Sequence, residues 1–73
     1  MNTKTQKRGG ELLLECRVEK GLLQHELADA LSMHQPSLSH YENGTYNIGV
    51  KVARRLGKYF NIDWLLFLPE NIE

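Results

Sequence analysis

The sequence predicts an all-helical fold of five short helices. Apolar residues recur three and four positions apart in successive segments, which is the spacing of one buried helix face. Glycine, asparagine or proline follows most of these segments, and such residues end helices. Ser32 and Met33 make the remaining turn. No stretch alternates apolar and polar residues as a half-buried strand would. With 73 residues, 41% of them hydrophobic, the chain is expected to form one domain around one core.

The domain is expected to span residues 11–68, between an N-terminal arm and a C-terminal tail at residues 69–73. Residues 1–10 contain no large apolar side chain after Met1 and end in a Gly-Gly pair. No burial would therefore offset the entropy lost on ordering this segment, which is predicted to be a flexible basic arm. Its basic residues are Lys4, Lys7 and Arg8.

Two short helices joined by a tight turn are expected in the middle of the domain. The first runs from about residue 24 to residue 31, and the second from about residue 35 to the stop pair Asn43-Gly44. Pro36 is tolerated because the amides of a first helical turn have no acceptor within the helix. This is the layout of a helix-turn-helix, whose second helix enters the DNA major groove. The residues expected to face the core are Leu27, Ala28, Leu31, Leu38 and Tyr41.

Three further helices are expected over residues 11–20, 49–60 and 64–68. Gly57 lies inside the second of these, where glycine costs about 1 kcal/mol relative to alanine and usually marks a close helix contact. Asp63 is placed to cap the last helix. The residues expected on the buried faces are Leu12, Leu13, Cys16, Val52 or Ala53, Leu56 and Phe60, with Val18 as a further candidate.

The formal net charge of zero is unusual for a nucleic-acid binder, because lysine and arginine normally supply most of the nonspecific affinity. The bases are nevertheless clustered, in the N-terminal arm and in residues 51–58. Both clusters could attract DNA, or they could simply be solvated surfaces. The second cluster consists of Lys51, Arg54, Arg55 and Lys58.

Other kinds of chemistry have little support. Cys16 is the single cysteine, so no internal disulfide can form, and on an apolar helix face it is more often an inert small hydrophobe than a nucleophile. His25, His34 and His40 match no common metal-ligand spacing. No apolar run suits a signal sequence or a membrane helix. We expect a cytoplasmic protein with no enzymatic activity, cofactor, metal or small-molecule substrate.

Four strings of the sequence fall in the order and spacing of one family. They are Glu19 to Gln24, Glu26 to Ala28, Gln35 to Gly44 and Asn61 to Leu66. On these residues the chain resembles the lambda-repressor-like, Cro/C1-type (XRE) helix-turn-helix family. The resemblance implies a compact five-helix lambda-repressor-like bundle that binds double-stranded DNA as a homodimer, and a bacterial or phage origin.

The resemblance also implies a set of DNA contacts. In that family the glutamine that opens the second helix touches a phosphate and hydrogen-bonds the glutamine that opens the third, which reaches a base. These positions are Gln24 and Gln35 here. A carboxamide can pair with the N6 and N7 edge of adenine. Ser37 and His40 match further base-contacting positions, and Ser39 and Asn43 match phosphate-contacting ones, although Ser39 could equally be a packing residue.

Two more roles follow from the resemblance. Arg17 and Glu42 match positions that form a structural ion pair in several phage repressors of this type. The apolar run at residues 64–68 exceeds what one short helix needs, and Trp64 and Phe67 are candidate dimer contacts. The alternative is that this run only closes the core. The sequence departs from the family at the expected helix caps and in the turn, which hold Leu23, His34 and Ser32.

We therefore expect a sequence-specific DNA-binding transcriptional regulator, a repressor that binds a palindromic operator as a dimer. The alternative is an antitoxin-like or scaffold module that uses the C-terminal apolar run to hold a protein partner. The zero net charge and a third helix without lysine or arginine favour this alternative.

Overall fold

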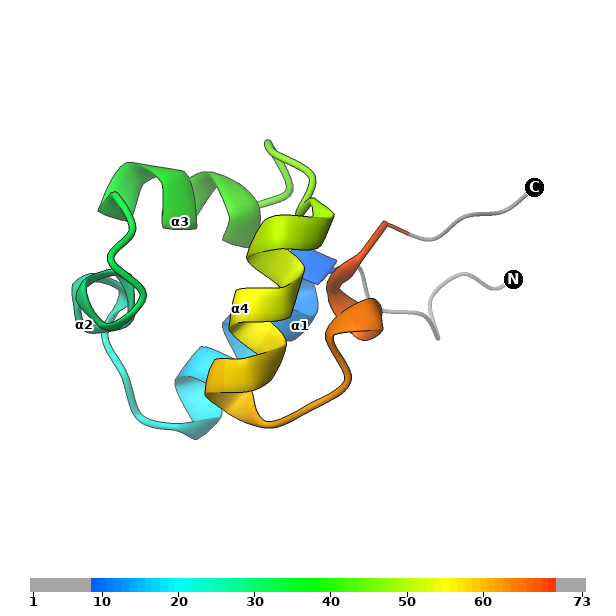
Figure 1. The fold of residues 1–73 in the computed structure, drawn as a ribbon. Coiled ribbons are helices and arrows are strands. Elements are labelled where there is room, and N and C mark those ends of the chain that lie inside the picture. The colour runs from blue at the N-terminus through cyan, green and yellow to red at the C-terminus, as the bar shows by residue number, and fades with distance from the viewer. Residues whose placement is uncertain (1–8, 70–73) are drawn as a thin grey trace.

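The computed structural model describes residues 9–69, and this range contains helices but no strand (Figure 1). The all-α class expected from the sequence is therefore confirmed. The N-terminal arm and the C-terminal tail of the sequence analysis lie almost entirely outside the described residues. The elements are α1 (Gly9–Glu19), α2 (Gln24–Ala30), α3 (Gln35–Glu42), α4 (Val50–Phe60) and the 3-10 helix η2 (Trp64–Phe67).

The expected count of five α-helices is wrong, because the last element is a single 3-10 turn. Its start is capped as predicted, since the carboxylate of Asp63 accepts a hydrogen bond from the backbone N–H of Leu65 at 3.1 Å. Its end is fixed by Leu68, which is extended with φ −76° and ψ 151°. A residue that precedes a proline, here Pro69, is pushed out of the helical region. Too few residues remain between the cap and this stop for a longer helix.

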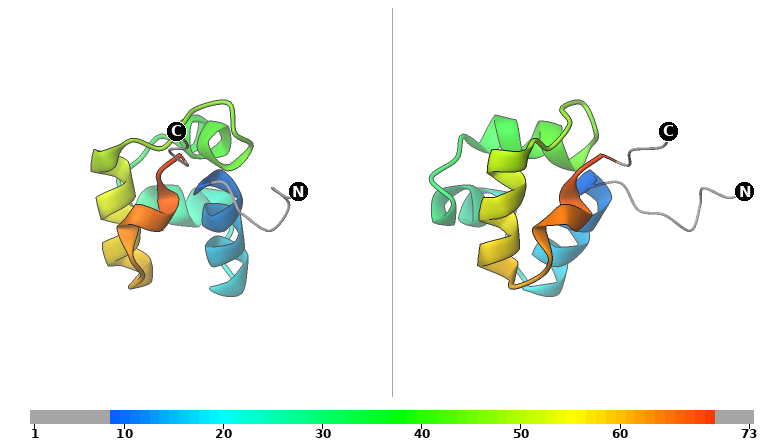
Figure 2. Two further views of the ribbon diagram at one scale, coloured as in Figure 1. Left: turned by 90° about the vertical axis from the view of Figure 1, so that its right-hand side faces the viewer. Right: turned by 45° about the vertical axis from the view of Figure 1, so that its right-hand side comes forward.

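The helices form two groups. Figure 2 shows η2 lying between α1 and α4, and η2 contacts both of these helices. In Figures 1 and 2, α3 lies across one end of this group, with α2 beside it. Within the described range no helix is long and apolar enough to span a membrane.

One hydrophobic core joins all five elements. Seven of its nine residues were expected from the helical spacing, and two were not. Ile48 comes from the α3–α4 loop, and Phe67 comes from the 3-10 turn. The buried residues are Leu13, Leu27, Ala28, Leu31, Leu38, Ile48, Ala53, Leu56 and Phe67.

The first turn of α1 corrects the expected boundary of the arm. Gly9 and Gly10 are helical and buried, so the domain begins at least two residues earlier than predicted. A Cβ atom on Gly9 would collide with the carbonyl oxygen of Phe67, and one on Gly10 would collide with that of Tyr41. The Gly-Gly pair therefore lets the backbone of α1 approach both η2 and the end of α3.

Gly57 has the close contact that the sequence analysis expected. A Cβ atom there would lie 2.6 Å from the Cβ of Trp64 and 2.9 Å from the carbonyl oxygen of Ile62. This glycine lets η2 pack directly on the backbone of α4.

The turn between α2 and α3 is built without glycine. Ser32 adopts the left-handed conformation with φ 52°, which costs about 1–2 kcal/mol for a residue with a Cβ. The backbone N–H of Met33 then donates to the carbonyl of Ala28 at 2.8 Å and closes the turn. This geometry brings the start of α3 next to the start of α2.

Candidate nucleic-acid interface

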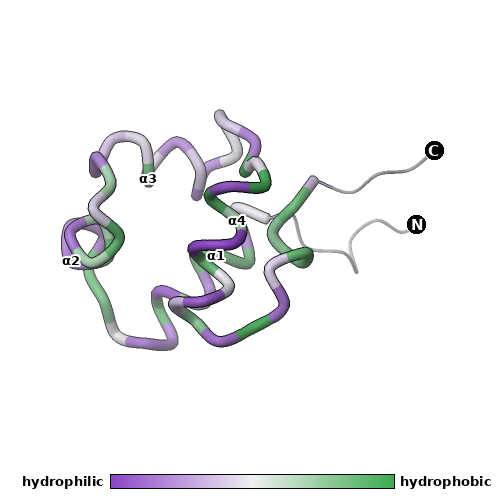
Figure 3. Tube along the Cα trace, in the orientation of Figure 1, coloured by the Kyte–Doolittle hydropathy of each residue, from purple (hydrophilic) through white to green (hydrophobic). Residues whose placement is uncertain are grey.

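Helix α3 presents a polar outer face at the edge of the molecule. Leu38 anchors its inner face and is fully buried, whereas Gln35 and Pro36 at its start are exposed. In Figures 1 and 2 no other helix lies over its outer side, and only the loop that follows α3 rises beside its end. In Figure 3 most of α3 is pale to purple, while the η2 segment is largely green. The outer face of α3 is therefore open to a partner.

The two helix-opening glutamines are hydrogen-bonded to each other. Nε2 of Gln35 donates to Oε1 of Gln24 at 3.2 Å. Gln24 is half-buried, and Gln35 is exposed. The contact therefore ties an exposed carboxamide at the start of α3 to a more firmly held one at the start of α2.

Gln24 is itself held by a third side chain that the sequence analysis did not connect to it. Its Nε2 donates to Oε1 of Glu42 at 3.0 Å. The two residues are 18 positions apart in the chain, so no local spacing signals the contact.

Arg17 and Glu42 form an ion pair between α1 and the end of α3. Nε of Arg17 donates to Oε2 of Glu42 at 2.6 Å, and Nη2 donates to Oε1 at 3.1 Å. The third guanidinium nitrogen, Nη1, donates to the carbonyl of Leu22 at 2.9 Å. The side chains are only 15% and 6% exposed. This two-pronged geometry fixes the orientation of the carboxylate.

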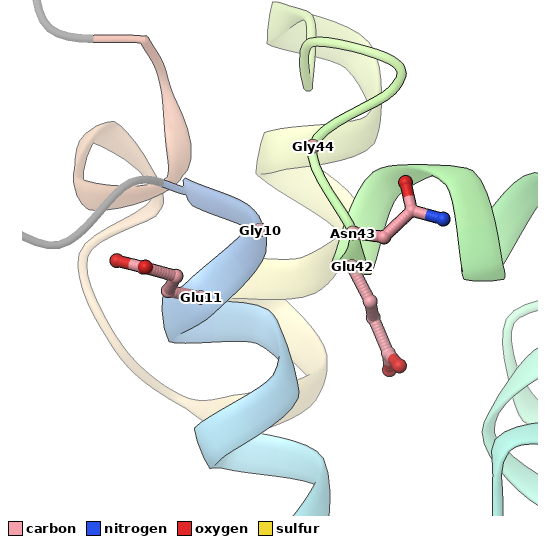
Figure 4. Close-up of a pocket in the computed structure, with 5 residues that line it drawn as sticks. All are labelled: Gly10, Glu11, Glu42, Asn43 and Gly44. Carbon is pink, nitrogen blue, oxygen red and sulfur yellow. The ribbon is translucent and has the colours of Figure 1, made fainter.

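A pocket lies where the first turn of α1 meets the end of α3 (Figure 4). In this view the side chain of Glu42 extends away from Gly44 and alongside α1, whereas Asn43 points away from α1. The Glu42 carboxylate is already engaged by Arg17. The pocket therefore has a structural origin in the close approach of α1 to α3. Its lining residues are Gly10, Glu11, Glu42, Asn43 and Gly44.

His40 is less available than a freely projecting side chain. It is half-buried, and its ring lies 4.6 Å from the ring of Tyr46, centroid to centroid. Its Nδ1 atom is buried and has no hydrogen-bond partner among the described residues. A contact from this ring to DNA would therefore have to use Nε2. Tyr46 lies in the loop after α3, and the sequence analysis did not single it out.

The two serines and Asn43 lie on α3 or at its end. Ser37 and Ser39 are half-buried, and Asn43 is exposed. Oδ1 of Asn43 accepts from the backbone N–H of Thr45 at 2.9 Å and from its hydroxyl at 2.6 Å. Its carboxamide nitrogen is left to donate outward, which suits an acceptor such as a phosphate oxygen.

The basic residues of α4 are all exposed, and their spacing of three, four and seven positions places them along one face of the helix. The guanidinium of Arg54 lies over the ring of Trp64, 5.5 Å from its centroid, and is thereby committed to the η2 side. Lys51 belongs to the first turn of α4, at the end of that helix nearest the α3–α4 loop (Figure 1). Helix α2 carries the acids Glu26 and Asp29. Of the α4 bases, Lys51 is the closest to the end of α3 along the chain.

The predicted dimer contact by Phe67 is wrong. This side chain is fully buried in the core of the single chain, between α1 and α4, and has no surface to offer. Its neighbours Leu65 and Leu66 are 56% and 57% exposed and were not singled out. A 3-10 turn places these residues on other sides than an α-helix would, because it has three residues per turn.

Cys16 and the histidines have no site around them in the structure. Burial raises the pKa of the Cys16 thiol, and the nearby carboxylates Glu19 and Glu15 raise it further. The thiol therefore stays protonated, which disfavours nucleophilic chemistry. No group of three or more His, Cys, Asp or Glu side chains in residues 9–69 is arranged to hold a metal ion.

This geometry, with two short helices joined by a tight turn and an exposed polar face on the second, defines a helix-turn-helix domain. A family model described as helix-turn-helix matches residues 13–67. The chain belongs to this family, in its Cro/C1-type branch, and membership makes it a DNA-binding domain.

Two proteins of Bacillus and of a Bacillus phage are similar to this chain. A protein of Bacillus subtilis (strain 168), named uncharacterized HTH-type transcriptional regulator YqaF, is 33% identical over 58 residues, which cover 80% of this chain and 76% of that protein. The ImmF control region 10 kDa protein of Bacillus phage phi105 is 40% identical over 57 residues. That match covers 78% of this chain and 63% of the phage protein, so less than two thirds of its length is represented here. No solved structure matches the chain.

Proposed function

We propose that the protein is a sequence-specific transcriptional repressor that binds a palindromic operator as a homodimer. The observation that carries the proposal is the hydrogen-bonded pair of Gln24 and Gln35 at the exposed edge of the molecule. A carboxamide that is held at the N-terminal end of an exposed helix can reach the edge of a base in the major groove. A regulator of bacterial or phage origin is supported by the Bacillus and phage relatives, and it would act on DNA in the cytoplasm.

The proposed base contacts come from the outer face of α3. Gln35 reads adenine through its remaining N–H and its Oε1. Ser37 and Nε2 of His40 contact neighbouring base edges within about one helical turn. Gln24, Ser39 and Asn43 position the helix on phosphates, which carry no sequence information but fix the register.

The proposed dimer contact involves the exposed side chains that follow Trp64. Leu65 and Leu66 are neighbours in the chain and are both more than half exposed. A twofold pairing through this region would bury them and set two copies of α3 about 34 Å apart, one turn of the duplex. Trp64 is half-buried beneath Arg54 and would lie at the margin of this contact.

Repression would follow from occupancy alone, since a dimer seated on an operator excludes other proteins from the same DNA. The name of the phage relative refers to a control region, which agrees with a regulator of this kind.

Selection of bound sites from random duplex DNA tests the proposal. Repeated selection with the purified chain should yield a palindrome whose half-sites are centred about 10 base pairs apart. Recovery of unrelated sequences would contradict sequence-specific repression, and a single half-site would contradict the dimer.

A protein-interaction module is the second candidate. It is favoured by the absence of lysine and arginine from α2 and α3 and by the two acids on α2. Salt separates the two functions. An operator complex should lose affinity steeply between about 50 and 200 mM salt because counterions are released. The apolar contact of an antitoxin-like or scaffold module with its protein partner should change little over the same range.

A further inference from the structure

A continuous series of hydrogen bonds runs from α1 to the exposed end of α3. Arg17 donates to Glu42, Gln24 donates to Glu42, and Gln35 donates to Gln24. The series has a direction that does not depend on which way a carboxamide is drawn. A guanidinium can only donate and a carboxylate can only accept. Gln24 must therefore turn its NH2 group to Glu42 and its oxygen to Gln35.

We propose that Glu42 is a positioning residue for base recognition, which sets the carboxamide orientation of Gln35 through Gln24 and thereby selects adenine over guanine. The inference rests on the proposed function. Because Oε1 of Gln24 is an acceptor, Gln35 must meet it with an N–H. The Gln35 oxygen is then turned away from Gln24, together with one remaining N–H. One acceptor and one donor match N6 and N7 of adenine, whereas guanine offers acceptors at both O6 and N7.

The two oxygens of the Glu42 carboxylate have different partners, and this difference makes the proposed role of Glu42 testable. Oε2 meets only Nε of Arg17, at 2.6 Å. Oε1 meets Nη2 of Arg17 at 3.1 Å and also receives the N–H of Gln24. In Glu42→Gln the remaining oxygen should occupy the shorter contact with the donor-only arginine. The new NH2 group would then face Gln24, and the hydrogen bond from Nη2 of Arg17 would be lost.

This substitution should invert the direction of the whole series. Gln24 would turn its oxygen to the new amide and its NH2 group to Gln35. Gln35 would accept from Gln24 through its oxygen and present two N–H groups outward. Two donors match O6 and N7 of guanine. The parent and the variant therefore differ in the base they prefer, although Gln35 itself is unchanged.

The experiment is site selection from random duplex DNA with the parent and with Glu42→Gln, followed by affinity measurements on duplexes that differ at the one pair read by Gln35. Gln35→Ala identifies that pair as the position where its preference disappears. We expect the parent to favour adenine by about five- to hundredfold, the range for one bidentate base contact. In Glu42→Gln this ratio should fall to one or reverse toward guanine.

Glu26→Gln is the matched control, because it makes the same change of charge on the neighbouring helix. Glu26 accepts a hydrogen bond from the backbone N–H of Leu23 at 2.8 Å, which an amide oxygen can keep. It takes no part in the series from Arg17 to Gln35. This variant should bind all duplexes somewhat more tightly, since one acid is removed, with the adenine preference unchanged.

A second variant keeps the test decisive if Glu42→Gln proves unstable. Replacing the pair together, Arg17→Met with Glu42→Leu, removes both charges at once and leaves neither buried alone. Gln24 is then free to turn either way, so the preference between adenine and guanine should shrink toward one in a protein that still melts cooperatively. An unchanged adenine preference in the folded variants would overturn the role of Glu42 while leaving the repressor proposal intact. Failure of the parent to select any site would overturn the repressor proposal itself.

Discussion

At the scale of single residues, the proposed recognition depends on how firmly one exposed carboxamide is held. Gln35 is exposed, so on its own it would sample several rotamers at an entropic cost to binding. Its bond to the half-buried Gln24 reduces that freedom before DNA arrives. Less side-chain entropy is then lost when DNA binds, so more of the free energy of the base contact is available to distinguish one base from another.

Truncation of Gln35 tests the base contact directly. Gln35→Ala should weaken binding to the selected operator by about 1–3 kcal/mol, the range for one bidentate base contact. Binding to a scrambled duplex and the thermal melt should stay close to those of the parent, because the side chain is exposed. Equal affinities of the two proteins for the operator would refute base reading by Gln35.

The strained serine of the turn makes a prediction about stability. Ser32→Gly should raise the free energy of unfolding by about 0.5–1 kcal/mol, because glycine adopts φ 52° without a Cβ penalty but loses more entropy on folding. Ser37→Gly is the comparison, since the same change inside α3 should lower stability by about 0.5–1 kcal/mol. Chemical denaturation of both variants measures the two signs. A loss of stability in Ser32→Gly would contradict the strain argument.

At the scale of elements, the fold relies on glycines that let one backbone touch another. The close contacts at Gly9, Gly10 and Gly57 bring η2 and α3 within reach of α1 and α4. The ion pair of Arg17 and Glu42 then fastens α1 to the end of α3. These contacts hold the recognition helix at a fixed position on the rest of the domain.

Substitutions at Gly57, inside α4, and at Gly49, its N-cap, distinguish the effect of close packing from the general effect of replacing a glycine. Gly57→Ala should lower the free energy of unfolding by about 1–3 kcal/mol, because the added Cβ would lie 2.6 Å from the Cβ of Trp64. Gly49→Ala, at the N-cap of the same helix, has open space around the added atom and should cost less than about 1 kcal/mol. Denaturant titrations of the pair measure both. Similar values would mean that η2 moves away freely.

The intact ion pair should add little to the free energy of unfolding, whereas the loss of only one of its partners should lower that free energy strongly. Arg17→Met should cost about 3–5 kcal/mol, because the Glu42 carboxylate is only 6% exposed and would lose its partner. Arg17→Met combined with Glu42→Leu should cost clearly less than the single change, since no buried charge remains. A double-mutant cycle of unfolding free energies gives the coupling. Additive costs would show that the two charges act independently.

At the scale of the whole molecule, we propose separate surfaces for DNA binding and for dimer formation. In the proposed function the outer face of α3 would meet DNA, and the exposed leucines of η2 would meet a second copy. The two regions lie on different elements, so dimer formation leaves the recognition face of each copy open. Because the net charge of a single chain is zero, doubling the phosphate contacts in a dimer would be important for affinity.

A charge placed on the leucine surface should separate these two activities. Leu66→Asp should shift the chain to a monomer in sedimentation experiments and weaken binding to the full operator far more than binding to a half-site. The thermal melt should change little, because Leu66 is 57% exposed. Val18→Asp is the control, since Val18 is 61% exposed on α1 and is not part of the proposed contact. Loss of dimer in both variants, or in neither, would contradict the assignment.

Most of the fold followed from local patterns, because helix formation depends on neighbours three and four positions apart. The buried faces of α2 and α3 were expected from this spacing. The cap formed by Asp63 and the stop at Gly44, which is left-handed with φ 86°, were also expected. Ile48 escaped because a single apolar residue in a loop has no periodicity. The exposed leucines escaped because the last element was taken for an α-helix, which distributes side chains differently from a 3-10 turn.

Periodic apolar spacing, stop residues and matched glutamines were enough to settle the class of fold and to nominate the recognition helix. They act over a few neighbouring positions, and linear order records such interactions fully. The approach of Gly10 to Tyr41, the burial of Phe67 and the bond from Gln24 to Glu42 join segments far apart in the chain. Contacts of that kind depend on how the finished helices pack against one another, so the orientation of Gln35 became evident only in three dimensions.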